Sequence, residues 1–376
     1  VTDLFMESFS RRIYDWCKAN RLKFTGHYLC EDNLTVQTRY IGAAMPHYEY
    51  MHVPGIDHLG RNIDDLITVK QVSSAAHQLG KERVLCETYG CTGWNMSFDD
   101  QKWIGDWQLC LGVNLLNQHL ALYSLRGCRK RDFPPSINYQ QSWWPHHRLV
   151  SDYFARLSYI LTRGKFAADI LVIHPIQSAW SVYNPRDTTR ADEVNKRFVY
   201  VSEALCRIHR DYDFGDEKIM ATLGRVEGDT IIVGGSTYKL VIVPPSTTLQ
   251  ASTFNLLRRF VEGGGKLIFI DPVPELVDGQ GSDQLRKLIE LAERIDCEKE
   301  QLQRILDELL PSDVEVKDDK GEQIGSIYYQ HRILGKVHIY FLANTDKDRS
   351  HGAMISLRGE GRLEEWDPLK GSIREV

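Results

Sequence analysis

The chain alternates short apolar segments with helical ones, and this alternation restricts its fold more than any other feature. Apolar segments at 22–29, 83–87 and 115–124 are each followed by a polar loop and then by residues with helical spacing of their apolar side chains. Strand, loop and helix repeated in this order are typical of parallel α/β sheets. We therefore predict three βα units within residues 1–166, with a long loop over 33–63 after the first strand.

A second pattern begins after residue 166. Short aliphatic strands without polar alternation are typical of strands that are buried on both faces of a sheet. With helices between several of them, they predict a flavodoxin-like doubly wound domain over residues 167–300, and a β-rich tail follows at 301–376. These aliphatic strands are Ile170–Ile173, Thr230–Val233, Lys239–Val243 and Lys266–Ile270.

Composition excludes several classes of protein. The 46 basic and 51 acidic residues give a net charge of −5, without the basic surplus that nucleic-acid binding usually requires. No apolar run approaches the roughly 20 residues of a membrane-spanning helix. The 8 cysteines show no CxxC spacing, which indicates free thiols and favours a reducing, cytoplasmic compartment. No metal-binding or phosphate-binding motif is present, so we predict neither a metal nor a cofactor.

Two glutamates follow predicted strands of the first region. Glu31 ends the first strand and Glu87 ends the second. In parallel α/β proteins the catalytic groups lie just beyond the carboxyl ends of the strands. A pair of carboxylates there suits glycoside cleavage, in which one donates a proton and the other attacks or activates water. Since a glutamate at a strand end is also commonly a solvated residue, its surroundings must support this interpretation.

The surroundings of these glutamates are rich in aromatic and polar residues. Sugars present apolar CH faces that stack on aromatic rings and hydroxyls that need fixed polar partners. Trp94, in a loop between Gly93 and Asn95, is the best stacking candidate. The predicted substrate-binding residues are His27, Asp32, Glu49, Asp57, Tyr89, Trp94, Lys102 and His119.

Several segments resemble those of a known family. Together they resemble large bacterial glycoside hydrolases, nearest to the α-L-rhamnosidase-like enzymes of family 106 and to related family 2 and family 42 proteins. The segments are Ser73–Gly80, Arg83–Glu87, Lys102–Asp106 and Leu111–Asn114, with His119.

The resemblance implies a specific architecture. Residues 1–166 would be the last three βα units of a catalytic (β/α)8 TIM barrel, so that the chain is a fragment of a larger enzyme. Residues 167–300 would be a glutamine-amidotransferase-like domain, and 301–376 the start of a β-sandwich. Glu87 would lie on the seventh barrel strand, where such enzymes carry their second catalytic carboxylate. Its partner would be Glu31 or Glu49, or would lie upstream of this sequence.

The sequence thus predicts a glycosidase that cleaves an oligosaccharide or polysaccharide, with Glu87 and Glu31 as catalytic carboxyls. The alternative is a non-catalytic carbohydrate-binding protein or an inactive fragment of such an enzyme. Amidotransferase activity is not expected, because Cys206 and Cys297 fall in predicted helices rather than at a strand-to-helix turn. The 167–300 region is instead expected to pack or to form a homo-oligomer contact.

Overall fold

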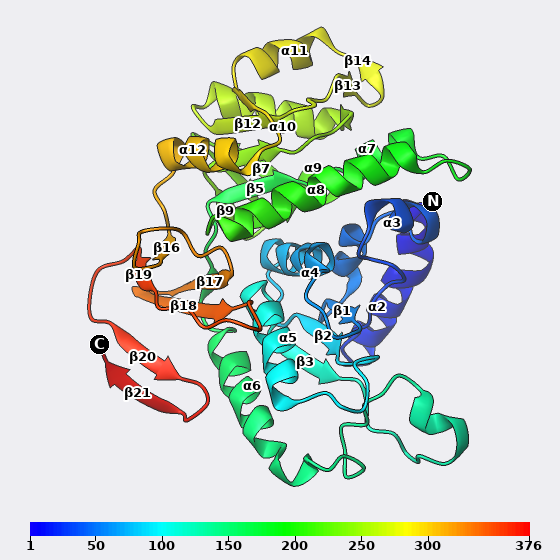
Figure 1. Cartoon of the computed structure of the whole chain (residues 1–376). Coiled ribbons are helices and arrows are strands. Elements are labelled where there is room, and N and C mark those ends of the chain that lie inside the picture. Colours follow the sequence, from blue (N-terminus) through cyan, green and yellow to red (C-terminus); the bar gives the residue numbers. More distant parts are fainter.

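A three-stranded parallel sheet forms the core of the amino-terminal part of the chain (Figure 1). The computed structural model describes all 376 residues. Helices follow the strands as the predicted βα rhythm requires, in the order β1 (Gly55–His58), α4 (Leu66–Gln78), β2 (Leu85–Thr88), α5 (Phe98–Cys110), β3 (Leu115–Gln118) and α6 (Arg148–Ile160).

Local capping explains where the two central helices begin. The Asp65 side chain accepts a hydrogen bond from the backbone N–H of Thr68 at the start of α4. Ser97 and Asp100 form a capping box before α5, each side chain accepting from the other's backbone N–H. The first helical segment of the chain consists of α1 (Thr2–Phe5), the π-turn η1 (Met6–Ser10) and α2 (Arg11–Ala19).

The prediction of the first strand was wrong. Residues 22–29 form no strand, and the first strand is β1, inside the segment predicted as a loop. That segment also contains α3 (Leu34–Tyr40) and the 3₁₀ helix η2 (Met45–Tyr50). The sequence of β1, Gly-Ile-Asp-His, carries one large aliphatic side chain, so it lacks the apolar run by which a buried strand is recognised.

A five-stranded parallel sheet forms the second part of the molecule. Its order, β15-β12-β10-β5-β6, becomes 2-1-3-4-5 when the strands are numbered along the chain and read from β6, which is the order of flavodoxin-like doubly wound sheets. Every residue of β5 and β10 is buried, as their aliphatic sequences predicted. The strands are β5 (Ile170–Ile173), β6 (Tyr212–Gly215), β10 (Leu240–Val243), β12 (Lys266–Ile270) and β15 (Glu293–Ile295).

One of the predicted aliphatic strands lies outside this sheet. β8 (Thr230–Val233) belongs to a small antiparallel sheet with β7 (Gly224–Glu227) and β9 (Ser236–Tyr238). The turns at Gly228 and Gly234, both with positive φ, fold these three strands back on one another. The other elements of this part are α7 (Ile176–Val182), α8 (Thr189–Arg207), α9 (Glu217–Leu223), β11 (Thr248–Leu249), α10 (Ala251–Glu262), β13 (Leu276–Val277), β14 (Gln280–Gly281), α11 (Asp283–Glu290) and α12 (Lys299–Leu309).

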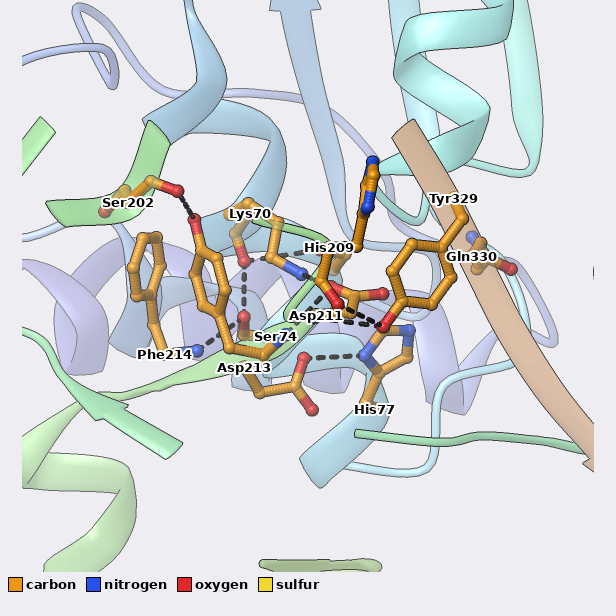
Figure 2. Close-up of polar contacts among 12 residues, drawn as sticks. Lys70, Ser74, His77, Ser202, His209, Asp211, Asp213, Phe214, Tyr329 and Gln330 are labelled. Atoms are coloured by element: carbon orange, nitrogen blue, oxygen red, sulfur yellow. Dashed lines mark hydrogen bonds and ion pairs between the residues drawn. The ribbon is translucent and has the colours of Figure 1, made fainter. Parts of the chain in front are cut away.

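Helix α4 joins the two sheets by covering the edge strand β6 (Figure 2). Ser74 Oγ accepts from the backbone N–H of Phe214 at 2.8 Å, and Gln78 donates to the Phe214 carbonyl at 2.8 Å. A buried ion pair, Lys70–Asp211, and a hydrogen bond between His77 Nδ1 and Asp213 Oδ1 flank these bonds, each 2.9 Å long. The side chains of α4 thereby satisfy backbone groups that an edge strand otherwise leaves unpaired.

Antiparallel strands make up the carboxyl-terminal part. β17 (Ile327–Leu334) and β18 (Val337–Asn344) form a hairpin, and β17 also pairs with β4 (Lys165–Phe166). β16 (Val314–Lys317) pairs with β19 (Met354–Leu357), and β20 (Glu364–Asp367) with β21 (Ser372–Glu375). None of the helices combines the length and the hydropathy that crossing a bilayer demands.

Candidate active site

Three polar side chains form a row across the amino-terminal sheet. Asp57 on β1 is the register partner of Glu87 on β2, and Glu87 is the partner of Asn117 on β3. Register partners in a sheet point to the same face, and neighbouring strands are about 4.8 Å apart. The row therefore places two carboxylates and an amide side by side near the carboxyl ends of the strands.

This row lies on the face of the sheet that points away from α4 and α5. The neighbouring residues Ile56 and Cys86 are buried in the main hydrophobic core, and the Thr88 hydroxyl accepts a hydrogen bond from Gln108 of α5. The side chains of Asp57 and Glu87 remain 30% and 29% exposed. A bound molecule can thus reach both carboxylates.

Two histidines lie close to the Glu87 carboxylate, one at each of its two oxygens. His27 Nε2 lies 3.7 Å from Glu87 Oε2, and His119 Nε2 lies 3.6 Å from Glu87 Oε1. The other nitrogen of His27, Nδ1, lies 3.6 Å from Asp57 Oδ1. Each Glu87 oxygen therefore faces one imidazole, which restricts the orientation of the carboxylate.

Asp57 differs from an exposed carboxyl in its electrostatic environment. Burial raises its pKa, and the neighbouring charge of Glu87 adds to this increase, whereas His27 opposes it. A carboxyl in this setting holds a proton more readily than a solvated aspartate, because two adjacent carboxylates repel each other when both are ionised.

Glu31, the predicted partner of Glu87, is buried beneath the site. Its Oε1 accepts hydrogen bonds from the Tyr48 hydroxyl at 2.8 Å and from the Tyr28 N–H at 3.1 Å, and only 3% of the residue is exposed. Burial raises its pKa well above the ordinary value, although these two hydrogen bonds lower it. A side chain so enclosed has no direct access to a glycosidic oxygen. The prediction assumed that Glu31 ends a strand, and it instead lies in a loop.

A hydrogen-bond network fixes the loop of Glu31. The side-chain amides of Gln37 and Gln71 donate to the Glu31 carbonyl at 2.7 Å and 2.8 Å. Gln71 Oε1 also lies 2.9 Å from the ring nitrogen Nε2 of His174, which follows β5 of the second sheet. The position of this loop therefore depends on contacts between the two parts of the molecule.

Glu31 could also take part in cation binding. One ligand atom each of His27, Glu31 and Asp57 lies within 4.8 Å of the other two, and Glu31 Oε2 is buried without a hydrogen-bond partner. One imidazole nitrogen and two carboxylate oxygens are a ligand set that divalent cations accept. No sequence motif predicted this group, because two of its members lie in the loop between α2 and α3 and the third on strand β1.

The structure brings some predicted residues to the row and leaves others away from it. His27, Asp57 and His119 contact Glu87 or one another. Trp94 is partly exposed on the loop after β2, and its indole N–H donates to the Lys130 carbonyl at 2.8 Å. Asp32 is exposed beside Glu31 and has no contact with the row.

Three predicted residues do not reach the site. Tyr89 is fully buried, and its hydroxyl donates to the Gln101 carbonyl. Lys102 pairs with Asp106 one helical turn later on α5. Glu49 is exposed on η2, and its backbone carbonyl lies 3.4 Å from Lys81 Nζ. Because Lys81 precedes β2, Glu49 lies near the amino end of that strand, whereas the row lies near its carboxyl end.

Two residues, one in the row and one near it, escaped the sequence analysis. Asn117 lies on a strand that was predicted, and counting alternate positions along that strand from His119 would have placed it on the same face. Phe133 packs edge-on against His119, with ring centroids 5.8 Å apart. Phe133 comes from the long loop after β3, and sequence spacing offers no signal for such a contact.

Comparison with known proteins identifies the family of this chain. Residues 31–376 match the profile of glycoside hydrolase family 106, described as alpha-L-rhamnosidase. The chain belongs to glycoside hydrolase family 106. The structure is similar to that of a rhamnosidase from Novosphingobium sp. PP1Y, with a TM-score of 0.75 and 21% identity over all of this chain and 36% of that one.

Two further proteins are similar to this chain. A GH42 beta-galactosidase from G. stearothermophilus superposes with a TM-score of 0.70 at 11% identity, over all of this chain and 65% of the other. A curated protein named putative beta-glucuronidase, from Formosa agariphila, is 24% identical over 319 residues, which are 81% of this chain. The matched part of this chain covers 26% of the length of that protein.

Proposed function

We propose that the protein of this chain hydrolyses an α-L-rhamnosidic bond and that Glu87 is its base or nucleophile. The observation that most directly supports this proposal is the position of Glu87. Its side chain is partly exposed at the carboxyl end of β2, and an imidazole faces each of its oxygens. Glycosidases need one ionised carboxylate that attacks the sugar or activates water. Membership of family 106 supports the rhamnoside as substrate.

His27 and Asp57 have a different role in this proposal. The imidazole of His27 contacts both carboxylates, Asp57 on one nitrogen and Glu87 on the other. A glycosidic bond cannot occupy the space that this ring fills, so Asp57 is not the acid partner of Glu87. We assign Asp57 and His27 to binding of sugar hydroxyls, for which fixed polar groups are required.

The proton donor to the leaving oxygen is then a further residue of the enzyme. Active sites of TIM-barrel enzymes are built from loops that follow all eight strands. Glu31 cannot supply this proton directly, because its carboxyl is buried under Tyr28 and Tyr48.

The test compares two glutamine variants in the full-length enzyme. Glu87→Gln should lower kcat for an aryl α-L-rhamnoside by about 10²–10⁴-fold, the usual contribution of a general base. Glu82→Gln is the matched control, because Glu82 lies just before the same strand and away from the row. Near-complete activity of Glu87→Gln would refute the assignment.

A further inference from the structure

A path of hydrogen bonds joins the second sheet to the row of the active site. It begins at His174, the residue after β5, and passes through Gln71 of α4 to the backbone carbonyl of Glu31. His174 Nε2 lies 2.9 Å from Gln71 Oε1, and Gln71 Nε2 donates to the Glu31 carbonyl at 2.8 Å. All three residues are buried. The path therefore crosses the contact between the two parts of the molecule.

The chemistry of the groups determines the direction of each bond. The Glu31 carbonyl only accepts, so Gln71 presents its N–H to Glu31 and its oxygen to His174. Burial lowers the pKa of His174 to about 3, so the ring is neutral and carries a single N–H. That N–H is on Nε2, because the oxygen of Gln71 accepts it, and Nδ1 is buried without a partner. His174 is thus a donor whose state does not change near neutral pH.

From Glu31 the path continues to the row. One carboxyl oxygen of Glu31 accepts the backbone N–H of Tyr28 at 3.1 Å. The Tyr28 carbonyl in turn accepts from His27 Nδ1 at 3.2 Å. The ring of His27 lies 3.6 Å from Asp57 and 3.7 Å from Glu87. The second sheet contributes no side chain to the row, yet it is connected to the ring that contacts both carboxylates.

The polar character of this path indicates a role in positioning. Apolar packing would stabilise a contact between two parts of a protein at lower cost, because every buried polar group needs a partner. A satisfied buried network, in contrast, fixes one arrangement of its members. Gln37 strengthens this network, since its amide donates to Gln71 Oε1 at 2.9 Å and to the Glu31 carbonyl at 2.7 Å.

We propose that His174 is a positioning residue of the active site, which holds the His27 imidazole against the two carboxylates of the row. It acts through Gln71 and the loop 20–33, which contains His27 and lies between α2 and α3. This inference rests on the proposed glycosidase function and adds a residue of the second sheet to it. His174 itself contacts no residue of the row, so its effect on turnover passes through His27.

The experiment is a double-mutant cycle in the full-length enzyme, with kcat and KM measured on an aryl α-L-rhamnoside. His174→Phe keeps an aromatic ring beside Phe198 and Phe214 but has no N–H to donate. We expect it to lower kcat/KM by about three- to tenfold, mainly through KM. In the background of His27→Ala the same change should cost less than about twofold, because residues that act as one unit are not additive.

Two further variants separate positioning from general damage. His174→Gln should retain most of the activity, since its amide can donate from the place of Nε2. Gln78→Leu is the control, because Gln78 is 1% exposed on α4 and donates to the Phe214 carbonyl and the Tyr238 hydroxyl, but to no group of the loop 20–33. It should lower the melting temperature as His174→Phe does and leave kcat and KM within about twofold.

Hydrogen exchange of the loop 20–33 gives a readout that needs no turnover. The backbone N–H of Tyr28 should exchange faster in His174→Phe than in the wild type, and at the wild-type rate in Gln78→Leu. Gln71→Met interrupts the path at its middle and should give the same results as His174→Phe. It keeps the test decisive even where His174→Phe does not fold.

Two outcomes would overturn the inference and leave the glycosidase function intact. One is an additive effect of His174→Phe and His27→Ala on kcat/KM, and the other is loop exchange that does not change in His174→Phe. A wild type that cleaves no rhamnoside would refute the proposed function. Faster loop exchange in His174→Phe would then still support the path to His27, and unchanged exchange would overturn it.

Discussion

Asp57 and Glu87 are register partners on adjacent parallel strands, and the ring of His27 contacts both of their carboxylates. This arrangement separates two tasks between neighbouring acids. Glu87 is held by imidazoles on both oxygens, whereas Asp57 has a raised pKa from burial and from the charge of Glu87. The predictions below test this division and the packing that supports it.

Replacing Asp57 should affect substrate binding more than chemistry. Asp57→Asn keeps the shape of the side chain and removes the charge-assisted hydrogen bond to a sugar hydroxyl. Such bonds are worth about 1.5–3 kcal/mol, so we expect KM to rise roughly 10–100-fold with a smaller change in kcat. Steady-state kinetics on an aryl α-L-rhamnoside measures both constants. A loss of kcat as large as that of Glu87→Gln, with KM unchanged, would contradict the division of roles.

The contact between the two sheets should depend strongly on Lys70. Its side chain is 1% exposed; burial lowers its pKa, but the charges of Asp211 and Asp213 together outweigh this effect, so that the pKa is raised. Lys70→Met leaves Asp211 as a buried charge without its partner, which should lower the free energy of unfolding by about 3–5 kcal/mol.

Urea denaturation measures this loss. Lys317→Met is the control, because Lys317 and its partner Glu315 are both about half exposed, and this variant should change stability little. Adding Asp211→Asn to Lys70→Met should restore part of the loss. A Lys70→Met protein as stable as the control would show that this pair does not hold the sheets together.

A buried glutamate away from the site should make stability depend on pH. Burial raises the pKa of Glu217 to about 7, although the Gln250 N–H, which donates to its carboxyl, opposes the increase. Between the unfolded value near 4.5 and about 7, the folded chain holds a proton that the unfolded chain has released. Stability therefore falls as pH rises through this window.

Glu217→Gln removes this dependence while keeping an acceptor for Gln250. The difference in melting temperature, variant minus wild type, should thus be larger at pH 8 than at pH 4.5. Exposed Glu262 provides the control substitution Glu262→Gln, for which the difference should be the same at both values. If the two variants respond alike to pH, Glu217 does not titrate as described.

The sequence was sufficient for elements with a local signal of their own. The helices α4 and α5 begin at side-chain caps, and the strands β5, β10 and β12 are runs of aliphatic residues that lie where predicted. It was not sufficient for β1, because a four-residue strand with one large aliphatic side chain is stabilised by pairing with β2 rather than by its own sequence.

The site was predicted only in part, because only some of its residues lie on elements with a clear sequence pattern. Glu87 ends a strand with a clear pattern, so its position at the sheet was predictable. Glu31 and Tyr89 were placed at the surface by their neighbours in sequence, but both are buried by long-range packing. Tyr48 covers Glu31, and Gln101 accepts the hydroxyl of Tyr89. Contacts of this kind depend on how distant loops fold over the sheet.

The most direct test of Glu87 as base or nucleophile is chemical rescue. In Glu87→Ala, the missing carboxylate leaves room for azide, a small anion that can attack the sugar without a base. We predict that Glu87→Ala is inactive on an aryl α-L-rhamnoside and that azide restores turnover with formation of a rhamnosyl azide. An inactive variant that azide does not rescue, or a variant that remains active without azide, would contradict the account.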